Sequence, residues 1–228
     1  MADNVVRLLS TLALKGAVGH LADRYQAATG TRIDADFAPT LALLDRLRSG
    51  EGADVVILTK QALDDLAAQG TVAADSCVDL ARSYVGIAVK AGAGHPDIAT
   101  EAALCATLLA ARSVAYSRIG ASGIFFAQLI ERLGIASEIN AKATVTSGFT
   151  ADRLIMGEAD LAVQQISELK QVAGIEVLGP IPRELQTAAV FSAGAMVASP
   201  RAAQAEQLLR FLASPEVAPV LRDSGLEP

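Results

Sequence analysis

Hydroxyl side chains stand at several turns where a strand-like segment gives way to a helix-like one. Thr11, Thr40 and Ser122 each occupy such a turn, and a fourth turn of this kind spans residues 147–150. Hydroxyl groups and the unpaired N–H groups of a helix's first turn both donate hydrogen bonds, and an oxyanion accepts them. The recurrence of these turns therefore predicts a binding site for a small anion.

The turn around Ser122 carries further features of an anion site. Gly120 and Gly123 allow the backbone to come close to a ligand, and Arg118 adds a positive charge beside them. We expect Thr11, Thr40 and Ser122 to occupy the N-cap positions of their helices. The alternative is that these hydroxyls only cap their helices and that Arg118 is a solvated loop charge.

The order of elements predicts how these turns are positioned. Strand and helix patterns alternate over residues 4–70 and again over 84–180, which indicates an α/β protein with mostly parallel sheets. The carboxyl ends of parallel strands meet at one edge of a sheet, so the turns should gather there. Two long strand-like segments, 83–90 and 185–198, bracket the second block and suggest a hinge. A single doubly wound domain without a hinge is the alternative.

Composition excludes several classes of protein. The chain has 228 residues, of which 52% are hydrophobic, but we find no uninterrupted apolar run that would span a bilayer. The formal net charge is −6 and no basic run is present, which argues against nucleic acid as a partner. Cys77, Cys105, His20 and His95 match no metal-binding spacing, so we expect no metal and no cofactor.

Several segments in a fixed order resemble one known family. These are Leu-Ser-Thr-Leu-Ala-Leu-Lys-Gly from position 9, Phe-Ala-Pro-Thr from 37, Ala-Asp-Val-Val-Ile-Leu-Thr from 53, Gly-Ala-Ser-Gly-Ile-Phe-Phe from 120 and Glu-Ala-Asp-Leu-Ala-Val-Gln-Gln-Ile-Ser-Glu from 158. Together they resemble the molybdate-binding-protein-like substrate-binding proteins over nearly the whole chain. The resemblance implies a two-lobed type II periplasmic-binding-protein fold with two hinge strands, which closes on an anion between the lobes. The expected lobes are residues 1–82 with 191–228, and residues 83–190.

The resemblance also implies which residues contact the ligand. With the charged residue of the third turn added, the predicted ligand-binding residues are Thr11, Thr40, Arg118, Ser122, Gly148, Phe149 and Gln165. Gln165 stands where the family has a tyrosine hydroxyl. Because an amide both donates and accepts, Gln165 and the guanidinium of Arg118 would suit an organic acid as well as a molybdate or tungstate type of oxyanion.

Three functions remain open at this stage, of which the sequence favours the first and leaves the other two as alternatives. The first is a solute-binding protein, expected to be a monomer, that delivers a small anionic ligand to the permease of an ABC transporter. The second is an isomerase of a tricarboxylic acid, similar to aconitate isomerase, that abstracts a proton next to a carboxylate. Its base could be Tyr116, Lys15 or a carboxylate from the opposite lobe, and the sequence does not place any of them at the anion turns. The third is a cytoplasmic anion sensor. The chain runs from Met1 directly into the first strand, so we expect a periplasmic protein if a signal peptide has been removed and a cytoplasmic one if Met1 is the native start.

Overall fold

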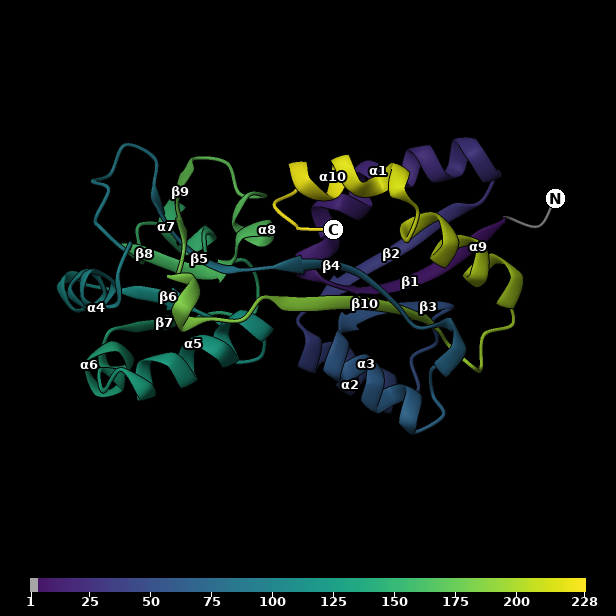
Figure 1. Cartoon of the computed structure of the whole chain (residues 1–228), viewed down its shortest axis with the longest axis horizontal. Helices are drawn as coiled ribbons and strands as arrows, with labels where there is room; N and C mark the ends of the chain where they lie inside the picture. Colours follow the sequence, from purple (N-terminus) through teal and green to yellow (C-terminus); the bar gives the residue numbers. More distant parts are fainter. Residues whose placement is uncertain (1–3) are drawn as a thin grey trace. The chain divides into compact units, whose positions relative to one another are not determined.

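The computed structural model describes residues 4–228 and divides them into two compact units (Figure 1). Unit 1 contains the described residues up to Ser83 together with Ala189–Pro228, and unit 2 contains Tyr84–Ala188. Each unit has its own five-stranded sheet. Residues 1–3, on which the expectation about the start of the chain depends, lie outside the described residues.

Unit 1 is a mixed sheet with helices on both faces. Its elements are β1 (Val5–Thr11), η1 (Leu12–Leu14), α1 (Lys15–Thr29), β2 (Arg32–Ala38), α2 (Thr40–Arg48), β3 (Val55–Thr59), α3 (Lys60–Ala68), η2 (Ala74–Ser76), β4 (Val78–Ser83), β10 (Ala189–Ala195), α9 (Ala202–Leu212), η4 (Pro215–Val217) and α10 (Ala218–Asp223). The strand order is β2-β1-β3-β10-β4, in which β1 is parallel to β2 and β3 while β10 is antiparallel to β3 and β4.

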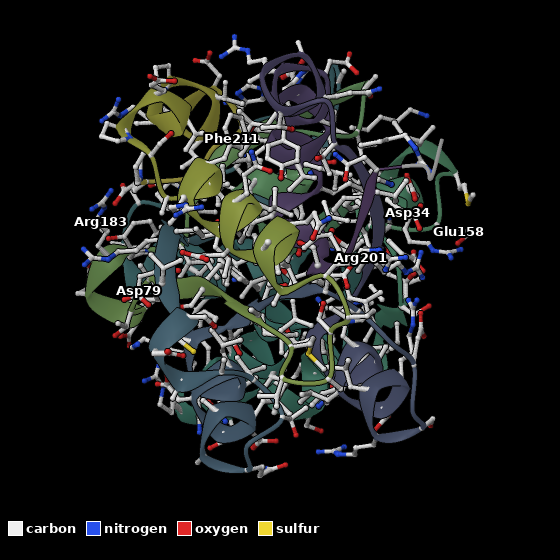
Figure 2. All side chains as sticks on the ribbon, turned by 90° about the vertical axis from the view of Figure 1, so that its right-hand side faces the viewer. Asp34, Asp79, Glu158, Arg183, Arg201 and Phe211 are labelled. Atoms are coloured by element: carbon white, nitrogen blue, oxygen red, sulfur yellow. The ribbon has the colours of Figure 1, made fainter. Side chains whose placement is uncertain are left out.

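Alternation along β1 supplies apolar side chains to both faces of this sheet. Leu8 belongs to the core under α1, α9 and α10, whereas Leu9 belongs to the core under α2 and α3 (Figure 1). On the first face, Phe211 (Figure 2) packs on Tyr25, and the centroids of the two rings are 5.2 Å apart. The helices on both faces hold β1 in place, and with it the turn that follows Ser10.

Unit 2 repeats the arrangement with different connections. Its elements are β5 (Val85–Lys90), α4 (Glu101–Ala110), β6 (Val114–Tyr116), α5 (Ala121–Arg132), α6 (Ala136–Ala141), β7 (Ala143–Val145), α7 (Asp152–Ile155), β8 (Leu161–Gln165), α8 (Ile166–Leu169), β9 (Ile175–Pro180) and η3 (Arg183–Leu185). The order is β7-β6-β8-β5-β9, with β6 parallel to β7 and β8 and with β5 antiparallel to β8 and β9. One core packs α4, α5 and α6 on the sheet, and another packs α7 and α8 on the opposite face.

The predicted α/β fold class is confirmed, but two details are wrong. The sheets are mixed rather than mostly parallel, because β10 and β5 each run antiparallel to both neighbours. The two segments predicted as long hinge strands also differ from the prediction: residues 83–90 are divided between β4 and β5, and the strand within residues 185–198 is limited to β10. Ser83 pairs with β10 and Val85 pairs with β8, so the ladder partner changes at Tyr84 and the strand ends there. None of the helices within residues 4–228 is long and apolar enough to cross a bilayer.

Candidate functional site

Thr11 and Thr40 lie at the same edge of the unit 1 sheet. Thr11 is the last residue of β1, and its partner in the parallel strand β2 is Ala38, two residues before Thr40. Both threonines are buried, with exposed fractions of 3% and 7%. This register places the turns that carry Thr11 and Thr40 after neighbouring parallel strands.

The hydroxyl of Thr11 is buried without a hydrogen-bond partner among residues 4–228. Thr11 does precede η1 with an extended backbone, but its side chain makes no capping hydrogen bond. The neighbouring Ser10 hydroxyl, by contrast, donates to the Thr11 carbonyl oxygen at 3.1 Å. A buried polar group left unpaired costs about 1–3 kcal/mol, so the Thr11 hydroxyl needs an explanation, and a ligand oxygen would supply its missing partner.

The predictions that Thr40 and Ser122 are N-caps are wrong. Thr40 is the first residue of α2 and Ser122 is the second residue of α5, while Pro39 and Gly120 occupy the N-cap positions. The carbonyl oxygens of Pro39 and Gly120 already accept the first backbone hydrogen bonds of these helices. The Thr40 and Ser122 hydroxyls are therefore not explained by capping.

Ser117 shapes the turn between β6 and α5, a role that the sequence did not reveal. Its hydroxyl oxygen accepts from the N–H groups of Ile119 and Gly120 at 3.2 and 3.1 Å. A Cβ atom at Gly123 would lie 1.5 Å from the Ser117 carbonyl oxygen, so this close approach requires glycine. Arg118 is exposed, and no ion pair or hydrogen bond engages its guanidinium within the described part of the chain. Its charge is available to a ligand.

A glutamine side chain fixes the turn that carries Gly148 and Phe149. The Gln164 Oε1 atom accepts from the backbone N–H and the hydroxyl of Thr150 at 2.8 and 3.0 Å. Its Nε2 atom donates to the Gly148 carbonyl oxygen at 3.3 Å. Because this carbonyl and Thr150 are both held by Gln164, the backbone of Gly148 and Phe149 is fixed to the end of β8.

The predicted residues of unit 2 meet at the carboxyl ends of three parallel strands. Tyr116 of β6 is the register partner of Val145 of β7, and Ala115 is the partner of Ala162 of β8. The turns containing Ser122 and Gly148 follow β6 and β7, and Gln165 ends β8 with an exposed fraction of 1%. The structure thus brings the predicted residues of each unit to one edge of that unit's sheet.

Sequence reasoning missed Glu168, a buried carboxyl beside this edge. Its side chain is 8% exposed, and burial raises its pKa to about 8 although hydrogen bonds from the Gln164 side chain and the Gln165 N–H oppose that rise. The available signal was its position as the third residue of a helix that begins directly after a strand end, where a Glu side chain returns to the N-cap N–H. Nothing in the sequence indicated that it is buried.

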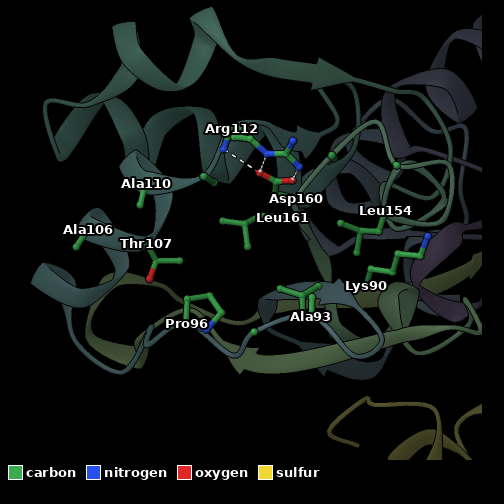
Figure 3. A pocket seen from close by; sticks show the side chains of 15 residues that line it. Lys90, Ala93, Pro96, Ala106, Thr107, Ala110, Arg112, Leu154, Asp160 and Leu161 are labelled. Atoms are coloured by element: carbon green, nitrogen blue, oxygen red, sulfur yellow. Dashed lines mark hydrogen bonds and ion pairs between the residues drawn. The ribbon is translucent and has the colours of Figure 1, made fainter.

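A cavity of about 660 Å³ in unit 2 contains none of the predicted residues (Figure 3). It lies near the amino ends of β6 and β8, and most of its lining is apolar. The Arg112 guanidinium at its rim is paired with Asp160, with Nη2 and Oδ1 2.6 Å apart, so this charge is already compensated. Within residues 4–228, no group of three or more His, Cys, Asp or Glu side chains could hold a metal ion.

Comparison with known proteins gives one relative of substantial identity. An aconitate isomerase from Pseudomonas sp. is 40% identical over 231 residues, which covers 97% of this chain and 87% of the relative. This likeness extends through both units.

Solved structures with the same fold are more distant in sequence. The periplasmic molybdate-binding protein of Azotobacter vinelandii has a TM-score of 0.83 at 17% identity, covering 98% of this chain and 99% of that one. The sulfate-binding protein of Mycobacterium tuberculosis has a TM-score of 0.79 at 13% identity, covering 99% and 87%. The family model described as bacterial extracellular solute-binding protein matches residues 6–227. The chain therefore belongs to the bacterial extracellular solute-binding protein family.

Proposed function

We propose that this chain binds a small polycarboxylate anion and isomerises it by moving a carbon–carbon double bond, as an aconitate isomerase does. The observation that carries the proposal is the 40% identity to an aconitate isomerase over 97% of the chain. The molybdate- and sulfate-binding proteins are 17% and 13% identical, and at that distance they support the fold alone.

The chemistry of the predicted residues fits a carboxylate ligand. The guanidinium of Arg118, which no ion pair or hydrogen bond engages within residues 4–228, presents a fork of donors that matches a carboxylate group. The Thr11 hydroxyl has no acceptor among the residues that the structure describes, and a carboxylate oxygen of the ligand could be that acceptor. Gln165 replaces the tyrosine that the resemblance implies, and its amide can pair with either a carboxylate or a protonated carboxyl.

The proposed isomerisation can be written as a balanced reaction without a cofactor. In an unsaturated tricarboxylate such as aconitate, a base takes a proton from the methylene carbon next to a carboxylate, and the electron pair spreads over the allylic system. Return of the proton to the former vinyl carbon places the double bond between the other two carbons. No atom is gained or lost, and the protein must only bind the anion and move one proton.

The proposal is tested by a ligand screen followed by a turnover assay. Thermal midpoints are measured with molybdate, tungstate, sulfate, citrate and the two aconitates, because a ligand that binds only the folded state raises the midpoint. Catalytic amounts of the protein are then incubated with each aconitate, and the isomers are separated by chromatography. We expect the tricarboxylates to raise the midpoint and the aconitates to interconvert. A response restricted to molybdate and tungstate would contradict the proposal.

A second candidate is an anion-binding protein that serves an ABC-type importer. Membership of the solute-binding family supports it. The same experiments separate the two candidates, since an importer's binding protein would bind its anion tightly and return it unchanged.

A further inference from the structure

Glu168 is hydrogen-bonded to the residues at the end of β8 in unit 2. Its carboxylate accepts hydrogen bonds from the Gln165 backbone N–H and from the Gln164 side-chain amide. That same amide donates to the Gly148 carbonyl oxygen at 3.3 Å. Glu168 is therefore hydrogen-bonded directly to the end of β8, and the Gln164 side chain links it to the 147–150 turn.

Among residues 4–228, no charged side chain forms an ion pair with Glu168. Helix α8 packs against β5, β8 and β9, whose charged residues are Lys90 and Glu176. Lys90 donates to the Ile155 carbonyl oxygen, and Glu176 pairs with His95. The pKa of Glu168 rises to about 8 because the side chain is buried, and the hydrogen bonds from Gln164 and Gln165 oppose this rise. With a pKa close to neutral pH, this carboxyl can be populated in both its protonated and its ionised form, as a group that gives and takes a proton must be.

We propose that Glu168 is the proton-transfer group of the isomerisation, a role that rests on the proposed function. Its ionised carboxylate takes a proton from the methylene carbon of the bound tricarboxylate, so that a C–H bond breaks and an O–H bond forms. The neutral carboxyl then returns this proton to the other allylic carbon, and the carboxylate is regenerated. A single carboxyl serves as base and then as acid, so no further reactant is needed.

A structural role for Glu168 makes a different prediction. As the third residue of α8, its side chain reaches back to the N–H of Gln165 at the N-cap. The substitution Glu168→Gln keeps the size of the side chain and one oxygen that can accept a hydrogen bond, but its amide cannot take up a proton at neutral pH. If Glu168 only holds the turn, this variant stays active. If Glu168 moves the proton, it binds but does not turn over.

The experiment compares the full-length wild type, Glu168→Gln and Glu138→Gln. Glu138 lies exposed on α6 in the same unit and controls for the loss of a carboxylate. Binding of trans-aconitate is measured by calorimetry, and turnover is followed by proton NMR in heavy water. We expect Glu168→Gln to lose at least about 100-fold in kcat. Its dissociation constant should stay within about threefold of the wild-type value, and Glu138→Gln should behave like the wild type.

The outcomes separate the two proposals. An active wild type with a Glu168→Gln variant of similar kcat overturns the role of Glu168 and leaves the proposed function standing. A wild type that interconverts neither aconitate overturns both. Should Glu168→Gln fail to fold, the pH dependence of the wild-type kcat decides. We expect kcat to rise with pH through about 8 as the base ionises, and a profile that is flat across this range contradicts the role.

Discussion

Replacing Thr11 with valine should stabilise the ligand-free chain and weaken its ligand binding at the same time. The hydroxyl of Thr11 is buried and has no partner within residues 4–228. Valine has nearly the same shape and replaces this hydroxyl with a methyl group. Removing an unpaired buried polar group relieves a cost of about 1–3 kcal/mol. In a chain of this size each kcal/mol raises the thermal midpoint by about 2–4 °C.

Ligand binding should change in the opposite direction. A hydrogen bond from a hydroxyl to a charged ligand contributes about 1.5–3 kcal/mol, so the affinity for a polycarboxylate should fall by roughly 10- to 150-fold. Both quantities come from thermal unfolding and calorimetric titration of the same preparation.

Ser10→Ala provides a matched control for this prediction. The Ser10 hydroxyl is equally buried but donates to a carbonyl oxygen, so its removal should lower stability by about 0.5–1.5 kcal/mol. The two hydroxyl deletions should thus shift the midpoint with opposite signs. A Thr11→Val variant that unfolds at or below the wild-type midpoint and binds with wild-type affinity would refute the reasoning.

Three further substitutions test the architecture and its titratable groups. Gly123→Ala would bring a Cβ atom to 1.5 Å from the Ser117 carbonyl oxygen, and urea denaturation should show a loss of more than about 3 kcal/mol. The hydrogen bond from Arg46 lowers the pKa of Glu51 to about 2, so the stability advantage of the wild type over Glu51→Gln should be present above pH 4.5 and vanish as the pH falls through about 2 in acid-unfolding series. Burial raises the pKa of Glu168 to about 8, so its contribution is present below pH 4.5 and lost as the pH rises through 8; urea midpoints of the wild type relative to Glu168→Gln should fall over that range.

The sequence predicts the elements well where a strong local pattern coincides with the tertiary contacts. Within residues 4–70 and 84–180, where strand and helix patterns alternate, β1, β6 and β8 form at short apolar segments. The prediction of one continuous strand from Ser83 is wrong, because a continuous β pattern in the sequence does not reveal that the hydrogen-bond partners change at Tyr84. That change depends on long-range pairing.

Cap positions and buried charge were harder to predict for similar reasons. Thr40 and Ser122 are good N-cap types, but Pro39 and Gly120 take the position because their carbonyls begin the helical hydrogen bonds. Glu168 resembles an ordinary surface residue of a short helix, and only the packing of α8 on β5, β8 and β9 shows that it is buried. The position of Glu168 after a strand end could thus be seen in the sequence, but its burial could not.

The most direct test of the proposed isomerase is proton NMR of trans-aconitate incubated in heavy water with substoichiometric wild-type protein. We predict that cis-aconitate accumulates over many turnovers and that the rate scales with protein concentration. If the protein binds trans-aconitate with one-to-one stoichiometry and the compound is recovered with its double bond in the original position, the account is contradicted. The protein would then be a binding protein and not an isomerase.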